Sequence, residues 1–270
     1  MDLNNFPSVG FNGISLVIPV MNEESNIEDL IRGILEIATS NPSLKIKEIV
    51  FVDDGSSDKT REIVRKYRIK ENQIKILLKE RFEKMGTVNA QLFGISQASH
   101  NNVLIMDGDL QHPVSVLPIL IKKYQEGFDF VIASRYVKGG GAERTIKHGI
   151  ISRGANFFAK FLLPWVSTVK DPISGFFIVN RRIVPTSIEM SGFNKLGLYI
   201  MSCKKNISIA EIPFKFKERA RGHSKVATGR FDYMIRYFRE LKYYRFLRKV
   251  VVGRFRPAPG SSEYLLLRQD

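Results

Sequence analysis

Residues 102–109 read NVLIMDGD, an apolar and partly β-branched run that ends in two carboxylates around one glycine. Two similar runs precede it, ISLVIPV at 14–20 and IVFVDD at 49–54. Near-continuous apolar runs of this length are typical of strands in a parallel sheet that is covered on both faces. The three runs therefore predict the centre of such a sheet.

Helical patterns separate these runs along the first half of the chain. We expect helices over 24–38, 58–67, 87–98 and 115–126, and further strands over 74–79 and 128–133. Strands that alternate with helices in this way form parallel sheets. The predicted class is therefore α/β, with a mostly parallel, Rossmann-like central sheet and helices on both faces. Ligands of such sheets bind at the carboxyl ends of the strands.

The second half of the chain elaborates the same sheet. After a glycine-rich segment at 138–141 we expect a helix over about 147–163 and strands at 176–180 and 207–214. A last helical stretch interleaves apolar with basic residues, and its apolar members are Phe231, Met234, Ile235, Phe238, Leu241 and Leu247. This pattern is typical of an amphipathic helix that lies on a membrane surface.

Composition limits the compartment and the partners. The 270 residues are 44% hydrophobic, enough for a large core, and carry a net charge of +15. Residues 1–113 have a net charge of −3 and residues 114–270 one of +18, so the second half favours phosphate ligands: nucleic acid, anionic lipid or phosphorylated small molecules. The single cysteine, Cys203, indicates a reducing compartment. The N-terminal residues lack the pattern of a signal peptide and predict a cytosolic start.

Carboxylates follow three of the expected strands. Asn22-Glu23-Glu24, Asp53-Asp54 and Asp107-Gly108-Asp109 come directly after them. At one sheet edge these charges repel each other unless a cation or hydrogen-bond donors lie among them. For residues 54–58 a turn and helix cap is an equally good interpretation. For residues 106–109 we favour a divalent ion, held by one or two carboxylates and by substrate phosphate.

Six motifs carry a family resemblance, and they occur in order between about residues 14 and 250. They are IPVMNE at 18–23, VDDGSSD at 52–58, IMDGDLQHP at 105–113, SRY at 134–136, ISRGAN at 151–156 and DPISGFF at 171–177. This series resembles the dolichyl-phosphate mannosyltransferase (polyprenyl-phosphate glycosyltransferase) group of the family-2 glycosyltransferases. The resemblance implies a GT-A fold, a nucleotide-diphosphate sugar donor, Mg²⁺ or Mn²⁺, and a lipid-phosphate acceptor.

The resemblance also implies a role for each motif. The expected nucleotide-sugar contacts are Pro19, Met21, Glu23, Asp53, Asp54, Asp107, Gly108, Asp109, Arg219 and Lys225. The expected metal ligands are Asp107, Asp109 and Gln111, and the expected acceptor-phosphate contacts are Arg135, Ser152 and Arg153. Catalysis is expected to rest on Asp109, Arg135, Arg219 and Lys225. A phosphate acceptor is already anionic, so we expect single-displacement inversion without a general base.

The sequence leaves alternatives open for the sugar donor and for the function of the protein. GDP-mannose is favoured by the motifs at 134–136 and 171–177, and UDP-glucose is the alternative. Residues 84–87 lack a glycine usual in the family, Met21 replaces a common aromatic residue, and no Gln-x-x-Arg-Trp signature of polysaccharide synthases is present. A non-enzymatic membrane-surface scaffold is the second alternative. Nucleic-acid binding is disfavoured because the acidic strand ends repel a polyanion.

These expectations define a domain plan. Residues 1–225 form the GT-A catalytic domain, with a nucleotide-sugar half at about 14–113 and an acceptor half at about 114–225. Residues 226–253 form the basic membrane-surface helix, and residues 254–270 are a tail that is either native or a tag remnant. The expected location is the cytosolic face of a membrane. A membrane-anchoring subunit or a further transmembrane segment would complete the attachment.

Overall fold

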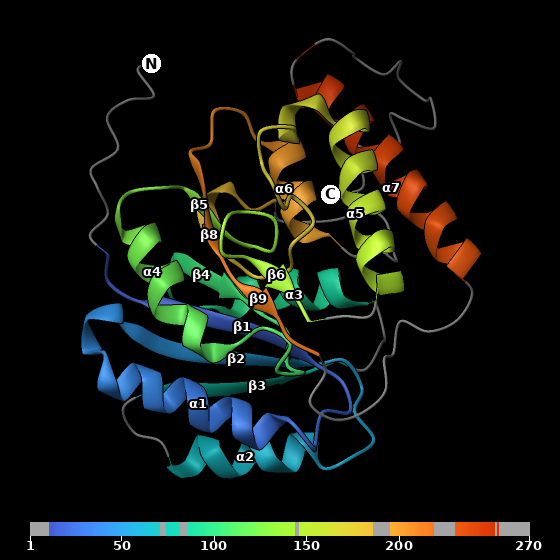
Figure 1. The fold of residues 1–270 in the computed structure, drawn as a ribbon. Coiled ribbons are helices and arrows are strands. Elements are labelled where there is room, and N and C mark those ends of the chain that lie inside the picture. Colours follow the sequence, from blue (N-terminus) through green and yellow to red (C-terminus); the bar gives the residue numbers. More distant parts are fainter. Residues whose placement is uncertain are drawn as a thin grey trace, which may run out of the picture.

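A central sheet organises the computed structural model, which describes residues 11–70, 74–81, 86–143, 146–185, 195–218, 230–251 and 253. Within these residues seven strands pair in the order β3-β2-β1-β4-β7-β5-β8 (Figure 1). The strands are β1 (Ile14–Val20), β2 (Ile46–Asp53), β3 (Lys75–Glu80), β4 (Asn102–Ile105), β5 (Phe130–Ser134), β7 (Phe177–Asn180) and β8 (Ile209–Pro213). A small second sheet pairs β6 (Gly141–Ala142) with β9 (Lys215–Phe216).

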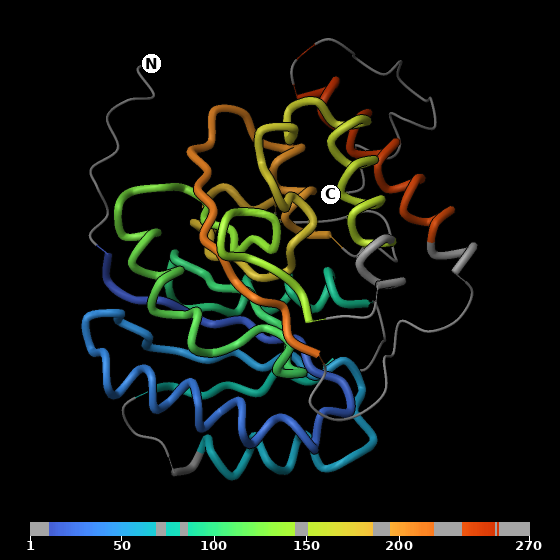
Figure 2. Tube along the Cα trace, viewed as in Figure 1, coloured from blue at the N-terminus to red at the C-terminus, as the bar shows by residue number. Residues whose placement is uncertain are grey.

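The direction of β7 decides what reaches the functional edge of the sheet. All neighbouring strands of the large sheet run parallel except β7, which is antiparallel to both β4 and β5. The predicted mostly parallel α/β sheet is therefore confirmed. Because β7 begins at the edge where β4 and β5 end, the loop at 171–176 lies at that same edge. Figure 2 shows how β8, far along the chain, returns beside β5.

Helices cover both faces of the sheet. One face packs against α1 (Ile27–Ser40), α2 (Thr60–Lys70) and α4 (Leu117–Gln125). The other packs against α3 (Thr87–Gln97), α5 (Ile146–Leu162), α6 (Leu196–Cys203) and α7 (Arg230–Val251). Short 3₁₀ turns are η1 (Pro42–Leu44), η2 (Val114–Val116), η3 (Pro164–Val166) and η4 (Arg181–Ile183). Alternate residues of β1 enter the two cores, as the period-2 geometry of a strand requires.

The first helix follows directly from its sequence pattern. Ile27, Leu30, Ile31 and Ile34 recur at helical spacing and are all buried against the sheet. Acidic residues in the first turn interact favourably with the positive end of the helix dipole. The helix begins at Ile27 rather than at residue 24, and residues 24–26 form a turn in which the carbonyl of Glu23 accepts from the N–H groups of Asn26 and Ile27.

The last helix belongs to the body of the domain. Leu241 and Leu247 of α7 are buried, together with Tyr237 and Tyr244, and α7 packs against α6. Met234 and Ile235 are exposed, and Phe238 is half-buried. The side chain of Phe231 lies outside the described part of the chain, and the other apolar residues that the sequence assigned to one membrane-facing surface divide between the core and the solvent. Among the described helices, none combines the length and the hydropathy needed to cross a bilayer.

Candidate active site

Hydrogen bonds join the loops that follow β1 and β2 into one unit. The side-chain oxygen of Asn22 accepts a hydrogen bond from the backbone N–H of Ser57 at 2.7 Å, and the N–H of Asn22 donates to Ser56 Oγ at 2.9 Å. The N–H of Glu23 donates to Thr60 Oγ1 at 2.8 Å. Asn22 has φ 51°, a left-handed conformation that asparagine tolerates better than most residues. These contacts set the position of the carboxylates beside them.

The Asp53-Asp54 pair presents polar atoms that the described residues do not satisfy. Asp53 is buried, and its Oδ1 accepts hydrogen bonds from the N–H groups of Gly55 and Ser56. Within the described chain, Asp53 Oδ2 has no hydrogen-bond partner, and Asp54 Oδ1 has none either. Buried polar atoms in native proteins are nearly always paired, so these atoms indicate a site for a ligand or for water.

Arg81 is a site residue that the sequence did not single out. Its Nη1 lies 3.6 Å from Asp54 Oδ1, and it too lacks a hydrogen-bond partner among the described residues. Its backbone N–H donates to the carbonyl of Asp53. The sequence signal was a basic residue two positions after the end of the strand expected at 74–79. Asp53, Asp54 and Arg81 together fit a polar ligand such as a nucleoside.

The turn-and-cap interpretation of residues 54–58 holds for part of that segment. Asp58 Oδ1 accepts hydrogen bonds from the N–H and the hydroxyl of Thr60, at the start of α2. Asp53 closes the turn before it. The Asp54 side chain takes part in neither the turn nor the helix cap, and its carboxylate is directed at Arg81.

The other residues that were expected to contact the nucleotide lie at the same edge of the sheet. Glu23 is buried, and its Oε2 accepts a hydrogen bond from Asn26 Nδ2 at 2.8 Å, so its carboxylate also holds the start of α1. Pro19 lies near the carboxyl end of β1 and is half-buried, and Met21 follows the strand and is also half-buried. The structure thus brings the predicted contacts of the β1 and β2 ends together.

The Asp107-Gly108-Asp109 turn is packed tightly against β1. A Cβ on Gly108 would lie 2.9 Å from Val20 Cγ1 and 3.4 Å from the carbonyl oxygen of Pro19. Only glycine fits there without displacement of β1. Asp109 is buried, and its Oδ1 accepts a hydrogen bond from the N–H of Gln111 at 3.1 Å.

A buried histidine packs against the Asp107-Gly108-Asp109 turn. The N–H of Asp107 donates to His112 Nδ1 at 3.0 Å, and His112 Nε2 lies 3.7 Å from Asp107 Oδ2. The imidazole stacks on Phe176 with ring centroids 4.8 Å apart. Burial lowers the pKa of His112, so the ring is neutral and Nδ1 can accept. The aromatic packing thus holds the aspartate turn in place.

The donor set of this turn fits a hard divalent ion. Asp107 is half-exposed and Asp109 buried, and Gln111 donates through Nε2 to the carbonyl of Lys217, which leaves its Oε1 available. In the described part of the chain, no three His, Cys, Asp or Glu side chains cluster closely enough to hold a metal on their own. Mg²⁺ and Mn²⁺ are typically bound by one or two carboxylates, with substrate phosphate and water as further ligands. Asp107, Asp109 and Gln111 are therefore suitable ligands.

Arg135 is held at the same edge by a buried carboxylate. Its Nε and Nη2 donate to the two carboxylate oxygens of Asp171 at 2.7 and 2.8 Å. Its Nη1 donates to Ser152 Oγ at 3.2 Å, and Ser152 also contacts the hydroxyl of Tyr136. Burial disfavours the charged guanidinium, but the hydrogen bonds and charge of Asp171 outweigh it and raise the pKa of Arg135. Among the described residues these bonds use three of its five N–H groups, which leaves two for a ligand.

Close backbone packing keeps Arg135 in position. A Cβ on Gly140 would lie 2.5 Å from the carbonyl oxygen of Ser134 and about as close to the backbone of Arg135. Gly141 pairs with Lys215 in the small sheet. The glycine-rich segment at 138–141 is therefore a packed support for Arg135.

The other expected basic residues either lie at the margin of the site or fall outside the described residues. Arg153 is exposed on α5, one residue after Ser152, and forms no ion pair with the described residues. Arg219 and Lys225 lie outside the described residues. The structure thus joins Arg135 and Ser152 at one site and leaves Arg153 at its margin.

Comparison with known proteins identifies the family. Residues 15–186, well over half of the chain, match the family described as Glycosyl transferase family 2. The chain belongs to glycosyl transferase family 2. Its relatives in this family include the dolichol-phosphate mannosyltransferase of Pyrococcus furiosus, 36% identical over 85% of this chain and 64% of that protein. The chain therefore spans less than two thirds of the length of this archaeal relative.

Fungal family-2 proteins are similar over most of the chain. The dolichol-phosphate mannosyltransferase of Mycosarcoma maydis is 30% identical over 86% of this chain and 79% of its own length. The enzyme of that name from Saccharomyces cerevisiae is 29% identical over 84% and 85%. These matches confirm the predicted family-2 membership.

Solved structures of a glucosyl-3-phosphoglycerate synthase share the fold. Glucosyl-3-phosphoglycerate synthase from Mycobacterium tuberculosis, in complex with Mn²⁺, UDP and glucosyl-3-phosphoglycerate, has a TM-score of 0.63 at 19% identity and covers 92% of this chain and 82% of its own. A structure of that enzyme with Mg²⁺ and UDP has a TM-score of 0.62 at 18% identity, with the same coverage. At this identity the likeness shows the fold alone, and it supports the GT-A prediction.

Proposed function

We propose that this family-2 chain transfers a hexose, with mannose from GDP-mannose favoured, to dolichyl or another polyprenyl phosphate. The observation that carries the proposal is the pairing of two chemistries at one sheet edge. The Asp107–Asp109 turn offers oxygen ligands for a metal–diphosphate group, and Arg135, held by Asp171, offers two N–H groups that no described residue accepts. A donor diphosphate and an acceptor phosphate need these two kinds of site.

The reaction follows from the charges of the two substrates. When bound, Mg²⁺ or Mn²⁺ neutralises the donor diphosphate and stabilises the departing nucleoside diphosphate. Arg135 and Ser152 seat the acceptor phosphate, with Arg153, Arg219 and Lys225 as further candidate contacts. One phosphate oxygen attacks the anomeric carbon as the bond to the donor phosphate breaks, which inverts the α-linked donor to a β-linked product. Because the phosphate is anionic, positioning and charge neutralisation replace a general base.

The relatives support mannose as the sugar. Three relatives at 29–36% identity are named dolichol-phosphate mannosyltransferase. UDP-glucose remains the second candidate donor, because the base and sugar-hydroxyl contacts decide the choice. The nucleotide-bound structures that resemble this chain contain UDP, but at 18–20% identity they do not bear on donor choice.

An apolar patch across two helices supports attachment to a membrane. We define it as Phe157, Phe158 and Phe161 of α5 with Met234, Ile235 and Phe238 of α7. Phe157 and Phe161 are 63% and 69% exposed, and the rings of Phe158 and Phe238 lie 5.1 Å apart and join the helices. Figure 1 shows α5 and α7 side by side at one end of the molecule.

Basic side chains border this apolar patch. Arg239 and Lys242 of α7 line a hollow together with Met234, Ile235 and Phe238, and Arg236 is exposed on the same helix. An exposed apolar surface with basic residues beside it fits the acyl and headgroup layers of an anionic membrane. We propose that this surface binds the cytosolic leaflet that carries the acceptor lipid, and an anchoring subunit or further transmembrane segment would strengthen the attachment.

A transfer assay tests the function. The purified chain is incubated with Mn²⁺, a short-chain polyprenyl phosphate in detergent, and either GDP-mannose or UDP-glucose, and the lipid product is analysed by mass spectrometry and NMR. We expect a β-linked mannosyl phospholipid, and stabilisation against heat by GDP with Mn²⁺ in preference to UDP. Transfer from UDP-glucose alone would support the alternative donor. Absence of transfer, with donor and metal bound, would support a non-enzymatic membrane-surface protein.

A further inference from the structure

One peptide unit beside the acceptor site is held at both of its polar ends by side chains from distant elements. The N–H of Asp171 donates to Glu211 Oε1 at 2.8 Å, and the carbonyl of Lys170 accepts from Asn156 Nδ2 at 2.8 Å. These two groups belong to the same peptide plane. The second carboxylate oxygen of Glu211 accepts the N–H of Lys170 at 2.7 Å. Glu211 comes from β8 and Asn156 from α5.

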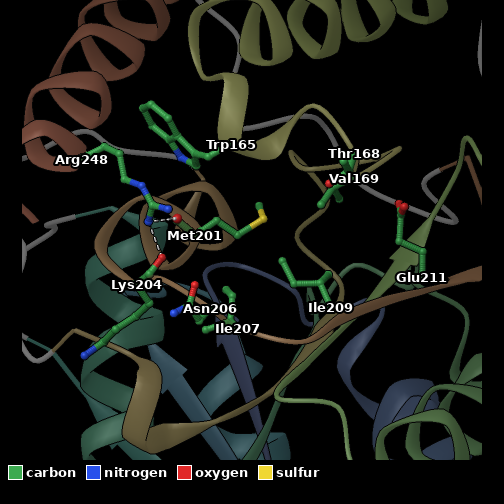
Figure 3. A pocket seen from close by; sticks show the side chains of 10 residues that line it. All are labelled: Trp165, Thr168, Val169, Met201, Lys204, Asn206, Ile207, Ile209, Glu211 and Arg248. Atoms are coloured by element: carbon green, nitrogen blue, oxygen red, sulfur yellow. Dashed lines mark hydrogen bonds between the residues drawn. The ribbon is translucent and has the colours of Figure 1, made fainter. Parts of the chain in front are cut away.

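These bonds determine where the carboxylate of Asp171 lies. Fixing both ends of the Lys170–Asp171 peptide sets the orientation of its plane, and so the direction in which the Asp171 side chain leaves the backbone. That side chain is fully buried and accepts from both Nε and Nη2 of Arg135. Glu211 itself does not touch Arg135. It borders a cavity of about 390 Å³, shown in Figure 3, which Trp165 and Arg248 also line.

We infer that Glu211 and Asn156 are positioning residues for the acceptor phosphate, which act through the Lys170–Asp171 peptide and Asp171 on Arg135. The inference rests on the proposed function, because it assumes that Arg135 binds the acceptor. A guanidinium recognises a phosphate through two parallel hydrogen bonds, and this geometry is lost when the group rotates. The carboxylate of Glu211 accepts from two N–H groups, which a neutral amide cannot do with both of its atoms.

The decisive variant is Glu211→Gln. Its NH₂ group would face one of the two backbone N–H groups, so the peptide and Asp171 would move. We expect the KM for polyprenyl phosphate to rise about tenfold, the size expected when one charge-assisted hydrogen bond is weakened. The KM for the nucleotide sugar should stay within about twofold, because the donor side is untouched.

Two further variants separate positioning from folding. Asn156→Ala removes the bond at the other end of the same peptide, should Glu211→Gln fold poorly, and should raise the same KM. Glu48→Gln is the matched control. Glu48 is a buried carboxylate of β2 that accepts from the N–H and the hydroxyl of Ser99, in the turn before β4, and from the hydroxyl of Ser15 in β1. It should lower the Tm and leave the acceptor KM unchanged.

Coupling to Arg135 completes the test. In an Arg135→Lys background, Glu211→Gln should raise the acceptor KM much less, because residues that act through one group are not additive. The inference is overturned if the acceptor KM is unchanged in Glu211→Gln and Asn156→Ala. It is also overturned if Glu211→Gln raises this KM equally in the wild-type and Arg135→Lys backgrounds. In both cases transfer by the wild type still supports the proposed function. Absence of wild-type transfer to any polyprenyl phosphate overturns both.

Discussion

Asp171 accepts three hydrogen bonds from Arg135, two from the guanidinium and one from the backbone N–H at 3.0 Å. The aspartate precedes β7 and the arginine follows β5, so the antiparallel direction of β7 is what brings them together. Both side chains are largely withdrawn from water, with Asp171 fully buried and the Arg135 side chain 10% exposed. The ion pair therefore joins the stability of the fold to the geometry of the proposed acceptor site.

Asp171→Asn should be strongly destabilising and inactive. It leaves the buried charge of Arg135 without its counter-charge, and such a change costs about 3–5 kcal/mol. Urea denaturation would measure the loss. Glu126→Gln is the control, because Glu126 pairs with Lys123 on the surface and the change should cost under about 1 kcal/mol. Equal costs for the two variants would contradict a buried, coupled pair.

Asp109→Ala should abolish metal-dependent turnover. The variant removes one oxygen of the proposed metal site and the hydrogen bond from the N–H of Gln111. We expect the Mn²⁺-dependent part of nucleotide binding, measured by calorimetry with and without EDTA, to weaken by about 100-fold. Asp29→Ala, at an exposed position of α1, should leave it unchanged. Metal-dependent turnover that survives in Asp109→Ala would show that the ion site is wrongly assigned.

Gly108→Ala should destabilise the aspartate turn. The new methyl group would lie 2.9 Å from Val20 Cγ1, and overpacking of this kind costs about 1–3 kcal/mol. Gly154→Ala is the matched comparison, because a Cβ there meets no atom within 4 Å in α5. It should be neutral or stabilising by up to about 1 kcal/mol. Thermal unfolding measures both, and a stabilised Gly108→Ala would contradict the close packing described above.

The double variant Phe157→Ser and Phe161→Ser should lose membrane binding. These side chains are the most exposed part of the apolar patch, and each buried aromatic side chain contributes about 1.5–3 kcal/mol. Co-sedimentation with vesicles containing anionic lipid would measure it. Ile119→Ser, an exposed apolar side chain of α4, should bind vesicles like the wild type. Binding by the double variant at the wild-type level would remove the patch from the membrane contact.

Glu48 should make stability depend on acid. Burial raises its pKa, but hydrogen bonds from Ser15 and Ser99 outweigh this and lower the pKa of Glu48 below its ordinary value of 4.5. The unfolded chain therefore binds the proton first, so the stabilisation is complete above 4.5 and is lost as the pH falls through the lower folded pKa. In Glu48→Gln the free energy of unfolding should decline less steeply with acid over that range. Parallel urea midpoints for both proteins from about pH 6 to about pH 3 would refute this.

The strands that form the centre of the sheet could be predicted because burial on both faces leaves a local mark. A strand covered on both sides must be apolar at nearly every position, as in β1, β2 and β4. The carboxylates that follow those strands then had to share one edge. In contrast, the sequence pattern did not predict α6. A helix that is buried on almost all sides has no polar face, so its sequence shows no helical period of apolar and polar residues.

Strand direction and side-chain partners arise from contacts between distant segments. The apolar pattern of β7 does not indicate whether the strand runs parallel or antiparallel to its neighbours. Only the antiparallel direction places Asp171 beside Arg135. Likewise, the pattern of α7 marks apolar residues but not which of them α6 covers. Local sequence thus specified which residues end the strands and carry charge. The pairing of those charges across the sheet depended on packing between segments far apart in the chain.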